Sequence, residues 1–142
     1  KAGSHGLEGA LGFSICDVSN KGDLTEIIEN VREQRNGDSI CFYMRFFLHS
    51  IPEETQETLL NTIADSAMPG DMLMAEFRTD KDEHNQHVFG DAHYRRYQNA
   101  DDFSKQIRHY YGWRVKFETE ESGLSPYKNE DPVLYRVIAT RD

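Results

Sequence analysis

The sequence predicts an α/β fold, with a sheet of three parallel strands, helices between them, and an antiparallel pair of strands at the carboxy-terminal end. Apolar runs at 11–16, 40–48 and 72–77 alternate with two segments of helical periodicity. An order of strand, helix, strand, helix, strand is typical of parallel pairing through right-handed crossovers. We therefore expect one domain over residues 11–142, preceded by a glycine-rich lead-in or expression-tag remnant at 1–10.

The first helix is expected to follow the strand at 11–16. Asp23 and Glu26 have the spacing of a capping box, and a turn at 36–37 containing glycine ends the helical pattern. The next run, 40–48, is almost continuously apolar. Because a parallel strand covered by helices on both faces needs such a sequence, we expect this strand to be central.

A second helix and a third strand complete the parallel part. Pro52 suits the first turn of a helix, and the sequence Pro69-Gly70 separates that helix from the strand at 72–77. The polar stretch that follows, 78–100, is too long and too rich in histidine, tyrosine and arginine to be an ordinary connector. Loops of this kind are usually functional or mobile.

The carboxy-terminal elements differ in pattern from those before them. Apolar spacing predicts a helix over 101–111, and strict alternation at 113–118 predicts a strand with one solvated face near the edge of the sheet. The segment between this strand and the last one, 133–139, contains glycine and prolines but no helical period. The last two strands should therefore run antiparallel to each other.

Composition excludes several classes of protein. The 142 residues carry a formal net charge of -9 spread along the chain, which argues against a nucleic-acid partner. No apolar run approaches the roughly 20 residues that cross a bilayer, and no signal peptide begins the sequence. We expect a cytoplasmic protein without a membrane span.

Polar side chains follow each of the three predicted parallel strands, and the carboxyl ends of such strands are where α/β sheets bind ligands. Asp17 is expected either to hydrogen-bond an adenine or ribose or to cap its own turn. Arg45 lies in an apolar run, so it must pair with an acid such as Glu76 or reach the rim. His49 either lies over a ligand or is a hydrogen-bonded structural residue.

The predicted loop at 78–100 contains two further groups of candidate site residues. Its histidines and aspartates follow no trusted metal-ligand spacing, so no metal site is expected. The sequence His-Tyr-Arg-Arg-Tyr at 93–97 packs two arginines between aromatic rings, which suits the binding of a phosphate, a carboxylate or a stacked ring. The alternative is a loop held by ion pairs to Asp101 and Asp102.

Four segments together resemble a known family. They are FSICDV at 13–18, FYMRFFLH at 42–49, AEFR at 75–78 and HYRRY at 93–97, followed by the antiparallel strand pair. They are similar to the second half of class I S-adenosylmethionine-dependent methyltransferases with Rossmann-like sheets, especially bacterial ones that modify cell-surface polysaccharides or other small acceptors. The resemblance implies S-adenosyl-L-methionine as cofactor and a small-molecule or glycan acceptor.

The resemblance also implies roles for individual residues. The cofactor would be bound beside the adenine and beneath the methionine moiety by Asp17, Val18, Arg45, Phe46 and Phe47. The acceptor would be bound by Arg78, Tyr94, Arg95 and Arg96. Methyl transfer is an in-line displacement helped mainly by alignment, and an acceptor that loses a proton would need a base from among His49, Glu76 and His93.

One departure from the family pattern is large. The glycine-rich turn that grips the cofactor, with its flanking strands, is absent from these residues. In the family's sheet, two strands lie between those expected here at 11–16 and 40–48, so their absence leaves a gap of roughly 10 Å. We expect the gap to close by re-pairing or by homodimerisation through the exposed edge. This chain alone should have little activity, and the alternative function is a non-catalytic binding or oligomerisation module.

Overall fold

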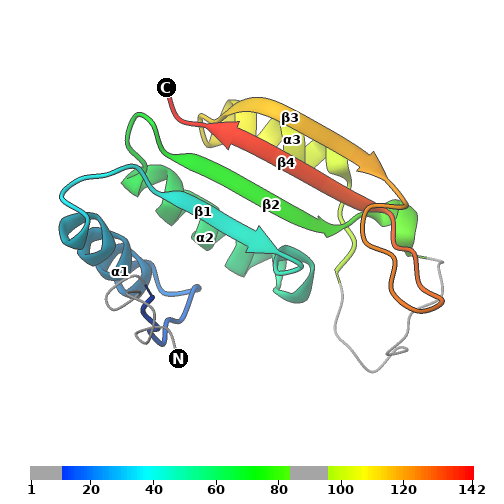
Figure 1. Cartoon of the computed structure of the whole chain (residues 1–142), viewed down its shortest axis with the longest axis horizontal. Coiled ribbons are helices and arrows are strands. Elements are labelled where there is room, and N and C mark those ends of the chain that lie inside the picture. The colour runs from blue at the N-terminus through cyan, green and yellow to red at the C-terminus, as the bar shows by residue number, and fades with distance from the viewer. Residues whose placement is uncertain (1–10, 84–95) are drawn as a thin grey trace.

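A computed structural model describes residues 11–83 and 96–142 of the chain (Figure 1). Its main elements are α1 (Lys21–Gln34), β1 (Cys41–Arg45), α2 (Glu53–Ser66), β2 (Met72–Arg78), α3 (Ala100–Lys105), β3 (Arg114–Glu121) and β4 (Leu134–Thr140). Short 3-10 turns lie at Leu48–Ser50 and Asp80–Asp82, and a π-helical turn at Gln106–Tyr110 continues α3.

The four strands form one sheet in the order β1-β2-β4-β3. β1 and β2 are parallel, whereas β4 runs antiparallel to both of its neighbours. The α/β class and the terminal antiparallel pair are therefore as the sequence predicts, and β3 lies at an edge as expected. In Figure 1, α2 and α3 lie behind the sheet and α1 lies beside the β1 edge, so among the described residues one face of the sheet is covered and the other is open.

The hydrophobic core lies between the sheet and the three helices. Alternate residues of each strand point into it because side chains in a strand alternate between the two faces. From β2 these are Leu73, Ala75 and Phe77, all at most 3% exposed. The core also contains buried residues from every helix and from β4, including Ile28, Leu60, Phe103, Ile107, Tyr135 and Val137.

A buried carboxylate fastens α1 to the sheet. Asp71, fully buried just before β2, accepts hydrogen bonds from the backbone N–H groups of Ile40 and Met68, both at 2.8 Å. Its carboxylate also accepts hydrogen bonds from both terminal nitrogens of Arg32 in α1, at 3.1 and 2.6 Å. These bonds fix the start of β1, the end of α2 and the last turns of α1 at one point. The cap of α1 is Asn20, whose side chain accepts from the N–H of Asp23, rather than the predicted Asp23.

The predicted strand at 11–16 is wrong. These residues form no strand, and Phe13 and Ile15 are 95% and 103% exposed. Among the described residues no strand lies beside this segment, so its backbone has no ladder to join, and strand propensity alone does not form a strand. For the same reason β1 is an edge strand instead of a central one, and the parallel part of the sheet is limited to β1 and β2.

The helices in the described ranges 11–83 and 96–142 are all too short or too polar to span a bilayer.

Candidate functional site

Three charged side chains form a row across three neighbouring strands of the sheet, β1, β2 and β4. Arg45, the last residue of β1, is the register partner of Glu76 in β2, and Glu76 is in turn the partner of Arg136 in β4. Directly opposed residues of neighbouring strands share one face of a sheet. The row therefore lies on the open face, at the carboxyl ends of the two parallel strands, which is where the sequence predicts a binding rim.

The central carboxylate of this row is held by both arginines. Glu76 is buried, and its Oε1 accepts a hydrogen bond from Arg45 Nε at 3.2 Å, while its Oε2 accepts from Arg136 Nε. Arg45 Nη2 also donates to Ser125 Oγ at 3.2 Å in the loop before β4. The pairing of Arg45 with Glu76 proposed from the sequence is present, and Arg136 adds a second cation to it.

The residue after this row has an unusual backbone. Phe46 adopts φ 54, in the left-handed region that bulky residues rarely occupy, and its N–H donates to the carbonyl oxygen of Glu76 at 2.8 Å. The guanidinium carbon of Arg45 lies 4.8 Å from the centroid of the Phe46 ring. Such backbone outliers cluster at binding sites, and this one lies at the end of β1 where a ligand is expected. Phe47, next in sequence, packs against the core.

His49 is buried beneath this turn. Its Nδ1 accepts a hydrogen bond from the backbone N–H of Arg78 at 3.0 Å, and its carbonyl oxygen accepts from the N–H of Arg96 at 2.7 Å. One ring nitrogen is therefore occupied in linking the end of β1 to the end of β2. This arrangement matches the structural alternative given for His49, and it leaves the proposed role as a base a prediction.

Arg78 lies in an ion-pair network at the end of β2. Its Nη1 contacts Asp82 at 2.9 Å and its Nη2 contacts Glu130, and both acids are buried. Asp82 also accepts a hydrogen bond from the N–H of Val133 at 2.9 Å, ahead of β4. The network links the loop after β2 to the loop before β4. Arg78, which the sequence predicts to bind the acceptor, therefore makes ion pairs within the protein.

Arg96 is held by oxygen atoms of the segment before α2 and of the first turn of that helix. Its Nε donates to the carbonyl of Ile51 at 3.0 Å, and its Nη2 donates to the carbonyl of Leu48 at 3.1 Å and to the side chain of Gln56. Gln56 also exchanges hydrogen bonds with Gln98. Arg96 thus holds its loop through neutral oxygens, and the ion pairs to Asp101 and Asp102, which were the alternative interpretation of this segment, are not among its contacts in the described residues.

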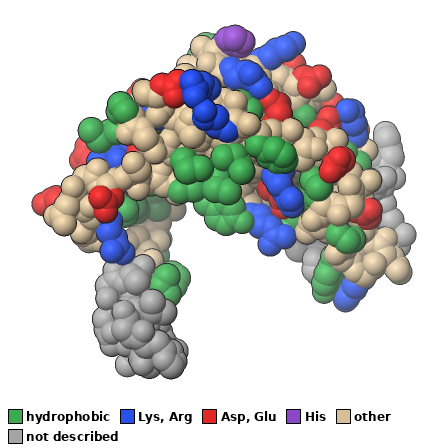
Figure 2. Space-filling view, turned by 45° about the horizontal axis from the view of Figure 1, so that its top comes forward, with side chains coloured by type: hydrophobic (Ala, Val, Ile, Leu, Met, Phe, Trp, Pro, Cys, Tyr) green, Lys and Arg blue, Asp and Glu red, His purple; other side chains and the backbone are tan. Residues whose placement is uncertain are grey.

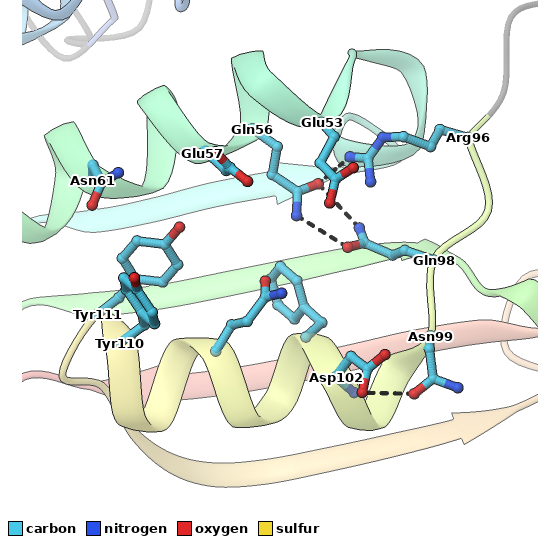
Figure 3. Close-up of a pocket in the computed structure, with 12 residues that line it drawn as sticks. Glu53, Gln56, Glu57, Asn61, Arg96, Gln98, Asn99, Asp102, Tyr110 and Tyr111 are labelled. Carbon is cyan, nitrogen blue, oxygen red and sulfur yellow. Dashed lines mark hydrogen bonds between the residues drawn. The ribbon is translucent and has the colours of Figure 1, made fainter.

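These amide contacts form one end of a groove of about 360 Å³ between α2 and α3. Figure 3 shows Gln56, Gln98 and Arg96 at that end and the rings of Tyr110 and Tyr111 at the other. The groove lies on the helix-covered side of the sheet, away from the row on the open face. Its wall is polar and includes Glu53, Glu57, Asn61 and Asp102.

Asp17 caps its own turn. Its exposed carboxylate accepts hydrogen bonds from the hydroxyl of Ser19 at 2.6 Å and from the N–H of Ser19 at 2.9 Å. These two bonds, the hydroxyl first, hold the pKa of Asp17 below its usual value. Val18 packs against the core. The geometry is that of the turn-capping alternative, and contact with an adenine remains a prediction.

Three of the predicted site residues, His93, Tyr94 and Arg95, lie outside the described residues. Within 11–83 and 96–142, no group of three or more histidine, cysteine, aspartate or glutamate side chains is arranged to hold a metal ion.

Arg136 was not predicted from the sequence. Its signal was the same as for Arg45, a lone arginine in an apolar strand, but the pairing of β4 with β2 decides that it faces Glu76. That pairing depends on contacts far apart in the sequence. Gln56 was missed because a neutral polar residue on a helix gives no pattern that distinguishes a buried amide from an exposed one.

Comparison with known proteins gives a match at the level of structure only. No protein-family model matches the chain, and no curated protein matches it. Among solved structures, a SAM-dependent methyltransferase from Anabaena variabilis aligns with a TM-score of 0.67 over 92% of this chain, at 12% sequence identity. A second SAM-dependent methyltransferase, from Methanosarcina mazei, aligns with a TM-score of 0.55 over 92% of this chain, at 10% identity.

The chain has part of the fold of a SAM-dependent methyltransferase. The family resemblance seen in the sequence is thus confirmed for the fold. The part is limited, since the alignments cover 58% and 63% of the two methyltransferase chains, less than two thirds of either. Within that part of a methyltransferase fold, the row of Arg45, Glu76 and Arg136 lies where parallel strands end.

Proposed function

We propose that this chain is the carboxy-terminal portion of an S-adenosylmethionine-dependent methyltransferase domain that methylates a small-molecule or glycan-type acceptor. The observation that carries the proposal is the alignment of 92% of the chain with a methyltransferase of which it covers only 58%. The matching part contains the ends of two parallel strands, and ligands of open α/β sheets bind at such ends.

Several described residues support the proposal because they offer groups suited to one side of the cofactor. Phe46 offers an aromatic ring at the end of β1, and Arg45 offers a cation beside it. The turn at Asp17 presents an exposed carboxylate ahead of α1. S-adenosyl-L-methionine supplies an activated methyl group on a sulfonium, and these residues would orient it and exclude water from one side. A glycine-rich turn after a strand is absent from the described residues, so we expect the chain alone to bind weakly and to have little activity.

The proposal is tested with S-adenosylhomocysteine and isothermal titration calorimetry. This compound, which S-adenosylmethionine becomes when it gives up its methyl group, is titrated into this chain and into a version extended upstream through the same reading frame. We expect binding by the extended chain and weakening of that binding by Arg45→Met. Arg114→Met is the matched control, because Arg114 is an exposed arginine on β3 whose ion pair is with Asp142 at 3.5 Å. Absence of binding by both chains would sink the proposal.

Two features of the described residues support a second function, homodimerisation through the sheet edge. β1 has a strand on one side only among the described residues, and the segment 11–16 exposes Phe13 and Ile15 almost completely. An open strand edge and an unpaired apolar segment both favour pairing with another chain. We propose that the segment 11–16 of one copy pairs with β1 of another, and that a two-fold exchange satisfies both chains.

Light scattering tests this second proposal. A dimer is expected for the wild type, and Phe13→Lys should shift the mass to that of a monomer. Tyr127→Lys is the control, since Tyr127 is an exposed aromatic residue in the loop between β3 and β4. A wild-type monomer, or a loss of dimer in the control as well, would argue against strand exchange.

A further inference from the structure

A small hollow on the open face of the sheet contains the charged row. It has a volume of about 230 Å³ and lies across β1, β2 and β4. Its apolar wall is formed by Tyr43, Met74 and Ile138, and its polar wall by Arg45, Glu76 and Arg136. Figure 2 shows a patch of hydrophobic side chains in the middle of the molecule with lysine or arginine side chains beside it. One site therefore combines an apolar surface with a cationic one.

The two arginines keep unused hydrogen-bond donors at this hollow. Arg45 donates through Nε and Nη2, and Arg136 donates through Nε and Nη2, the latter to the carbonyl of Leu124 at 3.5 Å. Within the described ranges, the Nη1 group of each arginine donates to no protein atom. The two side chains are 51% and 38% exposed, so neither is enclosed by the protein.

The charge at the hollow is opposite to that of the whole chain. Two arginines around one glutamate leave a local charge of about +1, whereas the chain carries -9. Glu76 holds both guanidinium groups in place, so their remaining donors are oriented before a ligand arrives. Preoriented guanidinium donors are well suited to a carboxylate or phosphate.

We propose that this hollow binds the carboxylate of a small organic acid whose apolar part lies against Met74 and Ile138. The apolar wall favours a carboxylate with an attached hydrocarbon over inorganic phosphate, which has no apolar part to bury. One part of this inference rests on the methyltransferase function proposed above: under that function, the acid is the methyl acceptor. Binding of the acid itself does not depend on methyl transfer.

The first test compares hexanoate with hexanamide, two ligands that differ in charge but share their hydrocarbon tail. Each is titrated into the whole chain while the Nε–H signals of Arg45 and Arg136 are followed by NMR. We expect shifts with hexanoate, weaker binding of acetate and of phosphate, and no shifts with hexanamide. Equal binding of hexanoate and hexanamide would overturn the proposal, and so would phosphate binding more tightly than hexanoate.

Substitutions in the charged row are expected to change the affinity for hexanoate in opposite directions. Arg45→Met and Arg136→Met should each weaken hexanoate binding by about tenfold, the usual effect of losing a hydrogen bond to a charged group. Glu76→Gln removes the negative charge, but it also replaces one of the two oxygens that hold the arginines by an NH2 group. The ligand carboxylate can then accept hydrogen bonds from the released guanidinium, so binding should strengthen by about fivefold. Arg114→Met, on the other edge of the sheet, should change nothing. Weaker binding by Glu76→Gln, with unfolding excluded by circular dichroism, would contradict the charge argument.

Competition by S-adenosylhomocysteine identifies the source of the carboxylate. If it displaces hexanoate from the upstream-extended chain, the hollow holds the carboxylate of the methionine moiety, and the inference about the acceptor is overturned. If both bind together, the carboxylate belongs to a separate acid. If hexanoate fails to bind while S-adenosylhomocysteine binds the extended chain, only the hollow's assignment fails and the methyltransferase function stands.

Discussion

The two faces of the sheet differ in how they are covered, although the same strands form both. On the helix side, Leu73 and Phe77 of β2 have no exposed surface. On the open side, Tyr43 of β1 and Phe117 of β3 remain 64% and 48% exposed. A strand in an α/β sheet with helices on both faces would bury both sets. The described residues therefore supply the layer for one face only, and the other face carries the charged row and the hollow.

The largest effect is expected from Leu73→Ala, on the covered face. Leu73 is fully buried among residues of the helices, and removing its side chain leaves a cavity. Such changes lower the free energy of unfolding by about 3–5 kcal/mol. Urea denaturation followed by circular dichroism measures this value. A loss below about 1 kcal/mol would mean that the helix layer is not closely packed on the sheet.

A slightly smaller loss, about 3 kcal/mol at neutral pH, is expected for Asp71→Asn. Burial alone would raise the pKa of Asp71, but the bonds from Arg32, Ile40 and Met68 outweigh it and hold the pKa below its usual value. A lowered folded-state pKa stabilises the fold above the unfolded-state value of about 3.9, and this contribution is lost as pH falls through the folded-state value.

The difference between wild type and Asp71→Asn should therefore shrink as acid is added below about pH 4. Urea denaturation at a series of pH values measures the change. The matched control is Asp65→Asn, which removes an exposed ion pair to Lys21 on the same helix layer and should have little effect. A difference that stays constant with pH would contradict the assigned role of the carboxylate.

A third substitution, Met74→Ala, compares the open face with the covered one directly, because Met74 is next to Leu73 but points to the other side. It is half-buried, and we expect a loss of only about 1 kcal/mol in the free energy of unfolding. If the loss instead approaches that of Leu73→Ala, something covers the open face in solution. Repeating the measurement at several protein concentrations would show whether a second copy provides the cover.

The smallest effect is expected from Ile15→Ser. The side chain is fully exposed, so the stability of a monomer should change by less than about 0.5 kcal/mol. In a strand-exchanged dimer the same change should lower the midpoint of unfolding in a concentration-dependent way. Denaturation at two concentrations separates the cases, with Val31→Ser on α1, a partly exposed apolar residue, as the comparison.

Local pattern predicted most of the fold. The apolar runs that became β1 and β2, the alternating run that became β3 and the last predicted strand, β4, have strand partners among the described residues. The run at 11–16 is also largely apolar but has no strand partner among the described residues, and a strand needs hydrogen bonds that its own sequence does not supply. The prediction that β1 is central was wrong for the same reason. Because residues 11–16 form no strand, β1 lies at the edge of the sheet.

The site was predictable where a charge lay in an apolar strand. Arg45 and its pairing with Glu76 followed from the cost of burying an unpaired cation. The second arginine of the row, Arg136, required the register of β4 against β2, which no local pattern contains. Likewise, the positive φ of Phe46 is a consequence of the turn after β1 and not of the residue type.

Arg141, the residue after β4, holds the end of this strand beside the only tryptophan of the sequence. Arg141 donates hydrogen bonds to the carbonyl groups of Tyr111 at 2.7 Å and Ala64 at 2.6 Å, and its guanidinium lies 4.8 Å from the ring of Trp113. Trp113 is 2% exposed and is the single tryptophan of the sequence. Its fluorescence is therefore a native optical signal for the docking of the last strand on the ends of two helices, readable without any label.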